Sequence, residues 1–327
     1  MTIPEILNGI KKLRALVVGD ICLDRWCTYD PATSEPSAET GIPRVGIVAS
    51  EVTPGGGGTV ANNLASLGPA KVAVLGVRGD DGFGFELDRA LTERGIDASL
   101  MVGVRPWQTF TYMKLLNIQT GIEDQPRADF INTKPLPAEA EQRIISNLTS
   151  AVGGFDVVLV ADQAETSAGG VVTPAVRESL ISLAAKFPEK IILVDSRRRV
   201  HLFHDVMVKP NYSEADAACQ ALFGSPDFKR LRETLGAKAL FLTHGRKGAL
   251  VFEEGKETWS KPRPVENPLD ICGAGDSFAA GTALTMAVTH DPVEAASFGN
   301  LVASITVMKK GTGTASPQEI LAAVATD

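Results

Sequence analysis

Short apolar runs of strand length alternate with segments of helical pattern along most of the chain, and this alternation constrains the fold more than any other feature. The runs are rich in Val, Ile and Leu, as in strands buried on both faces of a parallel sheet. They occupy residues 15–19, 71–77, 156–162, 190–195 and 239–245. The helical segments occupy residues 60–68, 84–95, 138–154 and 174–187. The pattern predicts an open α/β sheet covered by helices, with ligands at the carboxyl ends of the strands.

Two long segments interrupt this alternation. Residues 22–53 follow the first predicted strand with turn residues and short β-like pieces, and residues 102–133 contain the β-rich stretch QTFTYMKLLNI. Both are longer than ordinary connections between a strand and a helix, which favours a small accessory sheet. We therefore expect residues 1–327 to form a single domain that carries a small β lid built from these two segments.

The chain is mildly acidic, with a net charge of -7 and an isoelectric point near 5.3. This balance gives no general electrostatic reason to bind nucleic acid or an anionic membrane surface. No apolar stretch reaches the ~18 residues of a membrane span, and the N-terminal residues lack the pattern of a signal peptide. We expect a cytoplasmic protein without nucleic-acid or membrane partners.

The cysteines and histidines give little sign of a metal site. Cysteines stand at positions 22, 27, 219 and 272, without the paired spacing of a zinc site. In a reducing compartment we expect them to be free thiols. His201 and His204 have no partner cluster in the sequence, so we interpret them as turn or surface residues.

The string from Asp270 to Asp276 is the strongest local signal for chemistry. It reads Asp-Ile-Cys-Gly-Ala-Gly-Asp and runs directly into a helical pattern. A glycine-rich turn at the start of a helix exposes unpaired backbone N–H groups at the positive end of the helix dipole, which suits a phosphate. From these residues alone, Asp276 is either a reactive group at the mouth of an anion hole or a simple helix cap.

A second glycine-rich string, Gly55 to Gly58, precedes another predicted helix. Four consecutive glycines place no side chain between the backbone and a neighbour, so a ligand can approach the main chain closely. A flexible turn would have the same composition, and this string alone does not separate the two interpretations.

Together the two strings resemble the paired signatures of the ribokinase-like, or PfkB, carbohydrate kinase family. The resemblance extends from Val17–Asp20 to Gly311–Pro317 and so covers nearly the whole chain. Within the family the chain looks most like the kinases that act on heptose 7-phosphates in lipopolysaccharide-core synthesis. The strings that carry this similarity are residues 19–26, 33–39, 54–56, 63–68 and 209–214. The resemblance implies a ribokinase-like three-layer α/β sandwich with a mostly parallel central sheet and a small β lid.

The resemblance assigns the catalytic step to the Gly-Ala-Gly-Asp string. Asp276 would be the general base that accepts the proton of a sugar hydroxyl during attack on the γ-phosphorus of ATP. The backbone amides of Gly273, Ala274 and Gly275 would hold the charge that builds on the transferring phosphoryl group. Because Asp276 stands at a helix N-terminus, we expect it to have a low pKa.

By the same resemblance, the protein would use ATP and Mg²⁺. The residues expected to contact the nucleotide are Asn211, Glu214, Thr243, Gly245, Gly248 and Asn300, with Glu214 reaching Mg²⁺ through water. The Asn-x-x-Glu string at 211–214 is also the pattern of a turn and a helix cap, and Asn300 could equally be a surface residue.

Similar kinases often bind a monovalent cation beside the anion hole. Asp270, the Cys272 carbonyl and Ser316 occupy positions that resemble this site. Ile271–Cys272 departs from the common Thr-Thr of the family, so activation by K⁺ and the absence of any bound ion both remain open.

For the sugar, Asp24 resembles the first-strand carboxylate that takes two hydroxyl groups, with Gly55, Gly56 and Asn63 nearby. Thr59 stands where similar kinases usually have an Asn that touches the sugar, and a hydroxyl lacks the two-ended reach of an amide. An acceptor that already carries a phosphate would need cations around it. The candidates are Arg127 and the run Arg197–Arg199, which follows a predicted strand, although such runs are often only solvated surface.

These residues predict an ATP-dependent sugar kinase that acts on the anomeric hydroxyl of a heptose 7-phosphate. Two alternatives stay open: a kinase of this family for fructose, ribose or a nucleoside, and a sugar- or nucleotide-sensing protein without catalysis. We also expect a homodimer formed through the lid, as in similar kinases. The 327 residues are filled by one kinase unit, so we expect no room for the nucleotidyltransferase domain to which some similar heptose kinases are fused.

Overall fold

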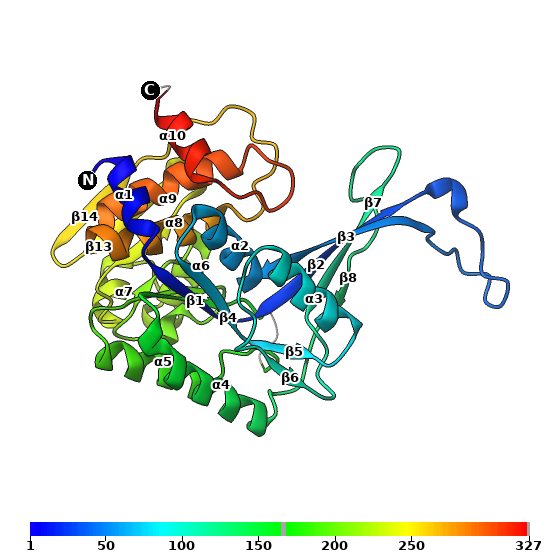
Figure 1. The fold of residues 1–327 in the computed structure, drawn as a ribbon, viewed down its shortest axis with the longest axis horizontal. Coiled ribbons are helices and arrows are strands. Elements are labelled where there is room, and N and C mark those ends of the chain that lie inside the picture. Colours follow the sequence, from blue (N-terminus) through cyan, green and yellow to red (C-terminus); the bar gives the residue numbers. More distant parts are fainter. Residues whose placement is uncertain (165–167, 326–327) are drawn as a thin grey trace.

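The protein is described by a computed structural model that covers residues 1–164 and 168–325, and its centre is an eight-stranded sheet (Figure 1). The strand order is β14-β13-β12-β11-β10-β9-β1-β4. The strands are β1 (Arg14–Gly19), β4 (Lys71–Leu75), β9 (Val157–Asp162), β10 (Ile191–Ser196), β11 (Met207–Val208), β12 (Leu240–Thr243), β13 (Ala249–Glu253) and β14 (Lys256–Ser260). The pairs from β4 to β12 are parallel, whereas β13 and β14 are antiparallel.

Helices cover both faces of this sheet and give it three layers. Alternate residues of one strand enter different cores: Leu16 and Val18 of β1 pack on one side, Ala15 and Val17 on the other. The first core is covered by α4 (Ala138–Ala151), α5 (Pro174–Lys186), α6 (Tyr212–Phe223) and α7 (Phe228–Thr234). The second is covered by α1 (Ile3–Ile10), α2 (Gly57–Leu67), α3 (Gly82–Glu93), α8 (Ala274–Thr289), α9 (Pro292–Thr306) and α10 (Pro317–Ala325). Each predicted strand and helix is present, which confirms the α/β sandwich with a mostly parallel sheet.

A second sheet extends away from the body of the molecule (Figure 1). This lid sheet has the strand order β3-β2-β7-β8 and consists of β2 (Ile21–Tyr29), β3 (Ile47–Gly56), β7 (Thr111–Asn117) and β8 (Ala128–Phe130). It comes from the two segments expected to leave the alternating pattern. One part of that prediction is wrong: β6 (Val102–Val104) pairs with β5 (Val77–Gly79) in a separate two-stranded sheet. Val102 and Val104 are buried in the first core, and this burial keeps them on the body.

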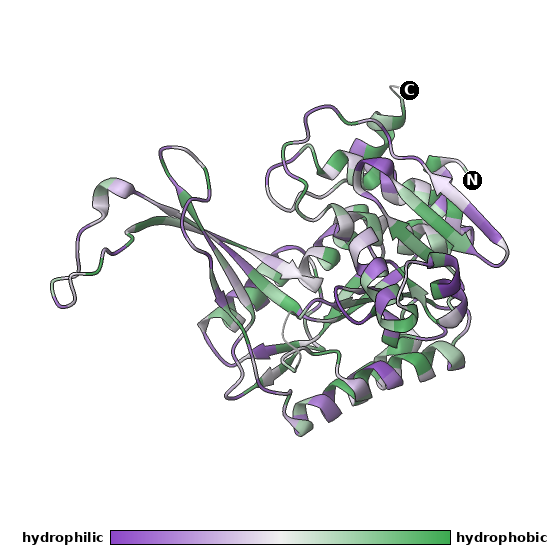
Figure 2. Cartoon of the chain, turned by 180° about the vertical axis from the view of Figure 1, so that it is seen from behind, coloured by the Kyte–Doolittle hydropathy of each residue, from purple (hydrophilic) through white to green (hydrophobic). Residues whose placement is uncertain are grey.

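The strands of the central sheet are the most consistently hydrophobic part of the chain (Figure 2), and several exposed apolar side chains belong to the outer part of the lid sheet and its loops. The exposed apolar residues of the lid segments are Ile42, Val45, Ile47, Val48, Ile118 and Ile122. These side chains belong to neither of the two cores.

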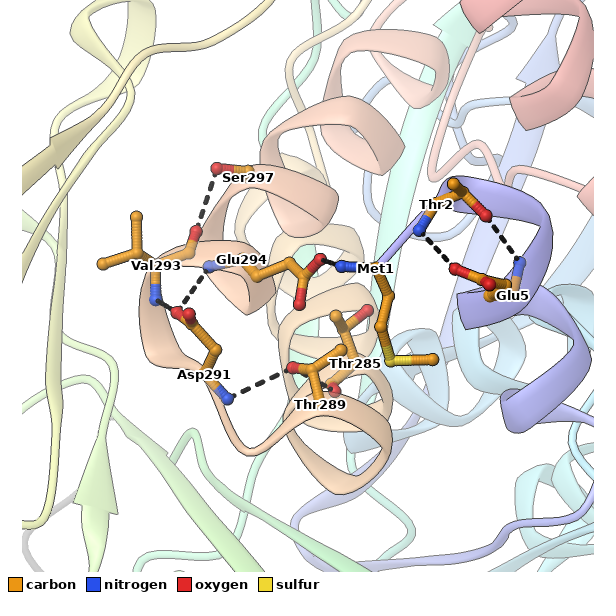
Figure 3. A network of polar contacts seen from close by, with 9 residues as sticks. All are labelled: Met1, Thr2, Glu5, Thr285, Thr289, Asp291, Val293, Glu294 and Ser297. Atoms are coloured by element: carbon orange, nitrogen blue, oxygen red, sulfur yellow. Dashed lines mark hydrogen bonds and ion pairs between the residues drawn. The ribbon is translucent and has the colours of Figure 1, made fainter.

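Polar contacts at the N-terminus hold the turn between α8 and α9 in place (Figure 3). The Met1 ammonium pairs with Glu294 in the first turn of α9. Asp291 caps α9 by accepting from the amides of Val293 and Glu294, at 2.8 and 3.0 Å. These contacts cap α9, and the Asp291 amide connects its start to the end of α8 by donating to the Thr289 hydroxyl at 3.2 Å.

Across residues 1–164 and 168–325, no helix is both long and apolar enough to cross a membrane. The four cysteines are free thiols, of which Cys272 alone is exposed.

Candidate active site

Two buried charges meet at the carboxyl ends of neighbouring parallel strands. Asp195 lies near the end of β10 and Lys209 directly follows β11; their side chains are 9% and 4% exposed. The Lys209 Nζ lies 3.0 Å from the Asp195 Oδ2, and the Lys209 amide donates to the Val194 carbonyl at 2.9 Å. Burial acts to lower the pKa of Lys209, but Asp195, Glu214 and Asp276 outweigh it and raise that pKa. Sequence reasoning assigned no role to Asp195 or Lys209, although a charge directly at a strand end was a usable signal.

The start of α8 faces this ion pair without a side-chain cap. Gly273 is the N-cap residue, with φ +78°, a left-handed conformation that favours glycine. Within the described residues, no acceptor is recorded for the amides of Gly273 and Gly275. The Ala274 amide, in contrast, donates to the Ile271 carbonyl at 3.2 Å. One of the three predicted anion-hole donors is therefore engaged in a local turn.

Lys209 lies beside these amides. A Cβ added at Gly275 would lie 3.7 Å from the Lys209 Nζ, so the ammonium group and the helix start share one small space. A buried cation beside backbone N–H groups that lack an acceptor at a helix N-terminus can bind a phosphoryl group.

Asp276 stands in the first turn of α8, and its pKa is raised to about 7. Loss of solvent is the main cause and the charge of Asp195 adds to it, while Lys209 and Arg197 act in the opposite direction. The expectation of a low pKa is wrong, because desolvation and a nearby carboxylate outweigh the helix dipole here. A carboxylate with a pKa near neutrality suits a general base.

Asp24 approaches the site from the lid sheet. It lies on β2, and burial raises its pKa to about 6, while Lys114, Arg127 and Arg197 act to lower it. Its carboxyl group fills the space beside Gly55, where an added Cβ would lie 2.5 Å from the Asp24 Cγ. Gly55 is therefore required for the position of Asp24, and any side chain there would displace the carboxylate.

The polar side chains at the glycine-rich start of α2 form hydrogen bonds within the protein. Gly56 caps α2 with φ +55°. The Thr59 Oγ1 donates to the Pro54 carbonyl at 3.3 Å, and the Asn63 Nδ2 donates to the Thr59 carbonyl at 3.0 Å. Asn63 is fully buried, which differs from the predicted sugar contact. Its Oδ1 has no hydrogen-bond partner among the described residues.

The arginines divide into two groups. Arg197 is exposed, and its charge opposes the burial that raises the pKa values of Asp24, Glu214 and Asp276, so it acts on both the lid side and the α8 side of the site. Arg199 instead forms a two-contact ion pair with the buried Asp162, with Nε to Oδ2 at 3.0 Å. Arg199 is thus a structural residue of the sheet end.

Arg127, the other predicted arginine, is exposed beside β8. It pairs with the Asp129 Oδ2 at 2.6 Å, and its guanidinium carbon lies 5.3 Å from the centre of the Tyr112 ring.

Asn211 and Glu214 form a reciprocal capping box at the start of α6. The Asn211 Oδ1 accepts from the Glu214 amide at 2.9 Å, and the Glu214 Oε2 accepts from the Asn211 amide at 2.7 Å. Burial raises the pKa of Glu214, Lys209 opposes this shift, and Asp195 adds to it. Glu214 is therefore a helix cap that also faces the Asp195–Lys209 pair.

The other predicted nucleotide residues lie around the end of β12. Thr243 is its last residue, and Gly245 begins a short 3-10 turn. Gly248 closes the turn with φ +91°, and a Cβ there would lie 2.7 Å from the Pro262 Cδ. Asn300 of α9 is buried, and its Nδ2 donates to the Ser260 carbonyl and hydroxyl, each at 2.9 Å. The amide nitrogen of Asn300 is therefore engaged within the protein.

The predicted cation residues are only partly brought together. The Asp270 carboxylate accepts from the Cys272 amide at 2.8 Å and from the Gly311 amide at 3.1 Å, which ties the anion-hole loop to the 311–316 loop. The Ser316 hydroxyl instead donates to Glu319 at 2.9 Å. Within residues 1–164 and 168–325, no three side chains of His, Cys, Asp or Glu cluster as metal ligands.

Comparison with known proteins identifies relatives that cover nearly the whole chain. The chain is 33% identical over 334 aligned positions to the bifunctional protein HldE of Pelobacter propionicus, covering 99% of this chain and 66% of that protein. It thus spans slightly less than two thirds of the length of this curated relative.

Solved structures share the fold. Phosphofructokinase-2 of Escherichia coli in complex with potassium superposes with a TM-score of 0.73 at 20% identity, covering 96% of this chain and 99% of that one. Ribokinase of Arabidopsis thaliana complexed with ribose and ATP gives 0.68 at 18% identity, with the same coverage. The ribokinase-like fold is thereby confirmed. A sequence profile described as pfkB family carbohydrate kinase matches residues 15–319, and the chain belongs to this family.

Proposed function

We propose that this protein transfers the γ-phosphoryl group of ATP to the anomeric hydroxyl of a heptose 7-phosphate. The observation that carries the proposal is the position of Asp276, a carboxylate with a pKa near 7 at an uncapped helix start beside Lys209. Asp24 faces it from the lid sheet as the group that binds sugar hydroxyls. The relative HldE favours the heptose acceptor.

In the proposed reaction, Asp276 accepts the proton of the hydroxyl as its oxygen attacks the γ-phosphorus. The new O–P bond forms while the bond from that phosphorus to the bridging oxygen breaks, and ADP leaves with that oxygen and its electron pair. The amides of Gly273 and Gly275 and the Lys209 ammonium stabilise the charge on the transferring oxygens. Asp195 keeps Lys209 charged and in place.

Nucleotide binding is assigned to the neighbouring strand ends. Asn211, Glu214, Thr243, Gly245 and Gly248 would line the phosphates and the nucleoside. Mg²⁺ is usually bound by one or two carboxylates together with substrate phosphates, so Glu214 would contact, through water, a Mg²⁺ ion carried by the phosphates of ATP. When bound, Mg²⁺ neutralises charge on the phosphates. A K⁺ ion at Asp270, Cys272 and Ser316 would require the Ser316 hydroxyl to leave Glu319.

An acceptor panel tests the proposal. The purified protein with ATP and Mg²⁺ should release ADP when given D-glycero-D-manno-heptose 7-phosphate, and ribose, fructose and a nucleoside should be poor acceptors. Turnover with one of those three but not with the heptose 7-phosphate would contradict the assignment of heptose 7-phosphate as the acceptor. Nucleotide binding without turnover on any of them would instead indicate a sensor.

The pKa values of Asp24 and Asp276 predict the pH dependence of kcat/KM. Both carboxylates act in the charged form, so activity is lost as the pH falls through about 7 and then about 6. The logarithm of kcat/KM should be flat above pH 7, fall with unit slope below it and steepen below pH 6. A profile measured between pH 5 and 9 checks this. A flat profile down to pH 5 would contradict the raised pKa values.

We also propose that the exposed apolar residues of the lid sheet pair with a second copy of this chain. Light scattering should give a mass of twice 34.6 kDa, and Val48→Asp should reduce it to 34.6 kDa because a charge would enter the interface. A wild-type protein that is monomeric at micromolar concentration would overturn this expectation.

A further inference from the structure

One face of the lid sheet turns towards the start of α8. Trp26 of β2 lies opposite Lys114 of β7, and two residues earlier on each strand Asp24 lies opposite Tyr112. Residues two apart on a strand share a face, so these four side chains lie on the face that carries Asp24. The Trp26 Cζ2 lies 3.9 Å from the position of a Cβ at Gly311, which places this face against the loop tied to Asp270.

Lys114 lies on this face, and the described residues accept no hydrogen bond from its ammonium group. Its Nζ lies 4.5 Å from the centre of the Trp26 ring, and its side chain is 23% exposed. The nearest carboxylate oxygen, Glu123 Oε2, lies 4.0 Å away, beyond hydrogen-bond distance. A partly buried cation whose donors are not used can bind an anionic ligand.

The electrostatics place Lys114 at the mouth of the candidate active site. Burial raises the pKa of both Asp24 on the lid sheet and Cys272 in the anion-hole loop, and the charge of Lys114 opposes both shifts. Arg127 and Arg197 also act on Asp24. Three cations therefore act on Asp24 at the acceptor side of the site, and the carboxylate that pairs with Lys114 lies beyond hydrogen-bond distance.

We propose that Lys114 determines the specificity for a phosphorylated acceptor by binding the phosphate ester that the sugar already carries. This inference rests on the proposed function, which has the sugar hydroxyls on Asp24. On β7, Tyr112 lies opposite Asp24, and Lys114 is two residues further along the same face of the strand, a distance of about 7 Å. A sugar held by Asp24 can span this distance with its phosphorylated end.

The Trp26 ring keeps Lys114 in place and presents its ammonium group to the phosphate. An ammonium group donates charge-assisted hydrogen bonds to phosphate oxygens, and the dianion competes well with a carboxylate 4.0 Å away. Loss of one such contact lowers affinity by about 10- to 100-fold. Binding of ATP, on the other side of the site, should not change.

The test compares matched acceptors in wild type and in Lys114→Met, which keeps the aliphatic stem against Trp26 and removes the charge. The pairs are the heptose 7-phosphate with its dephosphorylated heptose, and fructose 6-phosphate with fructose. Wild type should prefer the phosphorylated member. At pH 8, where Asp24 stays charged, Lys114→Met should raise KM for that member about 10- to 100-fold, with kcat and the KM for ATP nearly unchanged, and should leave the dephosphorylated sugar unaffected. Lys114→Arg should recover part of the preference.

Lys134→Met is the control, because Lys134 is an exposed cation in the loop between β8 and α4, which follows the lid sheet. It should retain the wild-type preference. If wild type uses the heptose 7-phosphate and Lys114→Met keeps its preference, the inference about Lys114 is overturned while the proposed function stands. If wild type prefers fructose 6-phosphate and Lys114→Met loses this preference, the heptose assignment fails and the role of Lys114 stands. A wild type with no preference for phosphorylated sugars overturns both.

Discussion

The variant Asp276→Asn is expected to lower kcat by about 10²- to 10⁴-fold, with the KM for ATP changed little. Asn has nearly the shape of Asp but accepts no proton, so the acceptor hydroxyl would lose its base while the amides of Gly273 and Gly275 and the Lys209 ammonium remain. Steady-state kinetics and a nucleotide-binding titration separate the two effects. A variant that keeps more than a tenth of the wild-type kcat would contradict the role of Asp276 as general base.

Stability provides the control for this variant. The pKa of Asp276 is raised from 3.8 to about 7 on folding, so its contribution to stability is present at low pH and is lost as the pH rises through about 7. Above that pH, wild type holds a charge in a site that disfavours it. Asp276→Asn should therefore melt at the same or a higher temperature than wild type at pH 8, with a smaller difference at pH 5. An inactive variant that melts lower at pH 8 would point to misfolding.

The variant Lys209→Met should have the second-largest effect. It removes the cation beside Gly275, so kcat should fall by about 10²-fold or more. It also leaves the buried Asp195 carboxylate without its partner, which should lower the free energy of unfolding by about 3–5 kcal/mol. Kinetics at saturating substrates and urea unfolding measure the two losses.

A double variant distinguishes the two roles of Lys209. Lys209→Met combined with Asp195→Asn removes both charges, so most of the lost stability should return while kcat stays low. If the double variant recovers activity together with stability, Lys209 serves only the fold and does not act on the phosphoryl group.

The sequence was sufficient to predict the layers of the fold because apolar runs with few polar residues allow little besides buried parallel strands. Runs 15–19 and 190–195 became β1 and β10 almost unchanged. The lid prediction was less accurate at residues 102–104, whose buried valines pair with β5. Such a three-residue strand has no periodicity that could separate it from the neighbouring lid segment.

The candidate site was predictable in its parts but not in its electrostatics. The glycine-rich strings located both helix starts and Asp276. The pKa of Asp276 depends on Asp195 and on burial, and neither the distance between residues 195 and 276 nor the solvent lost there can be read from local sequence. Asn63 and Asn300 show the same limit, because the hydrogen bonds from their amide nitrogens to the protein backbone cannot be read from local sequence.

The position of the new phosphate tests the central claim most directly. The protein is incubated with ATP, Mg²⁺ and D-glycero-D-manno-heptose 7-phosphate, and the product is examined by ³¹P NMR with coupling to protons. The geometry of Asp276, Lys209 and Asp24 predicts a second phosphate whose phosphorus couples to the proton at C1, with the 7-phosphate retained. A product phosphorylated at another carbon, or ATP hydrolysed with no sugar product, would contradict the account.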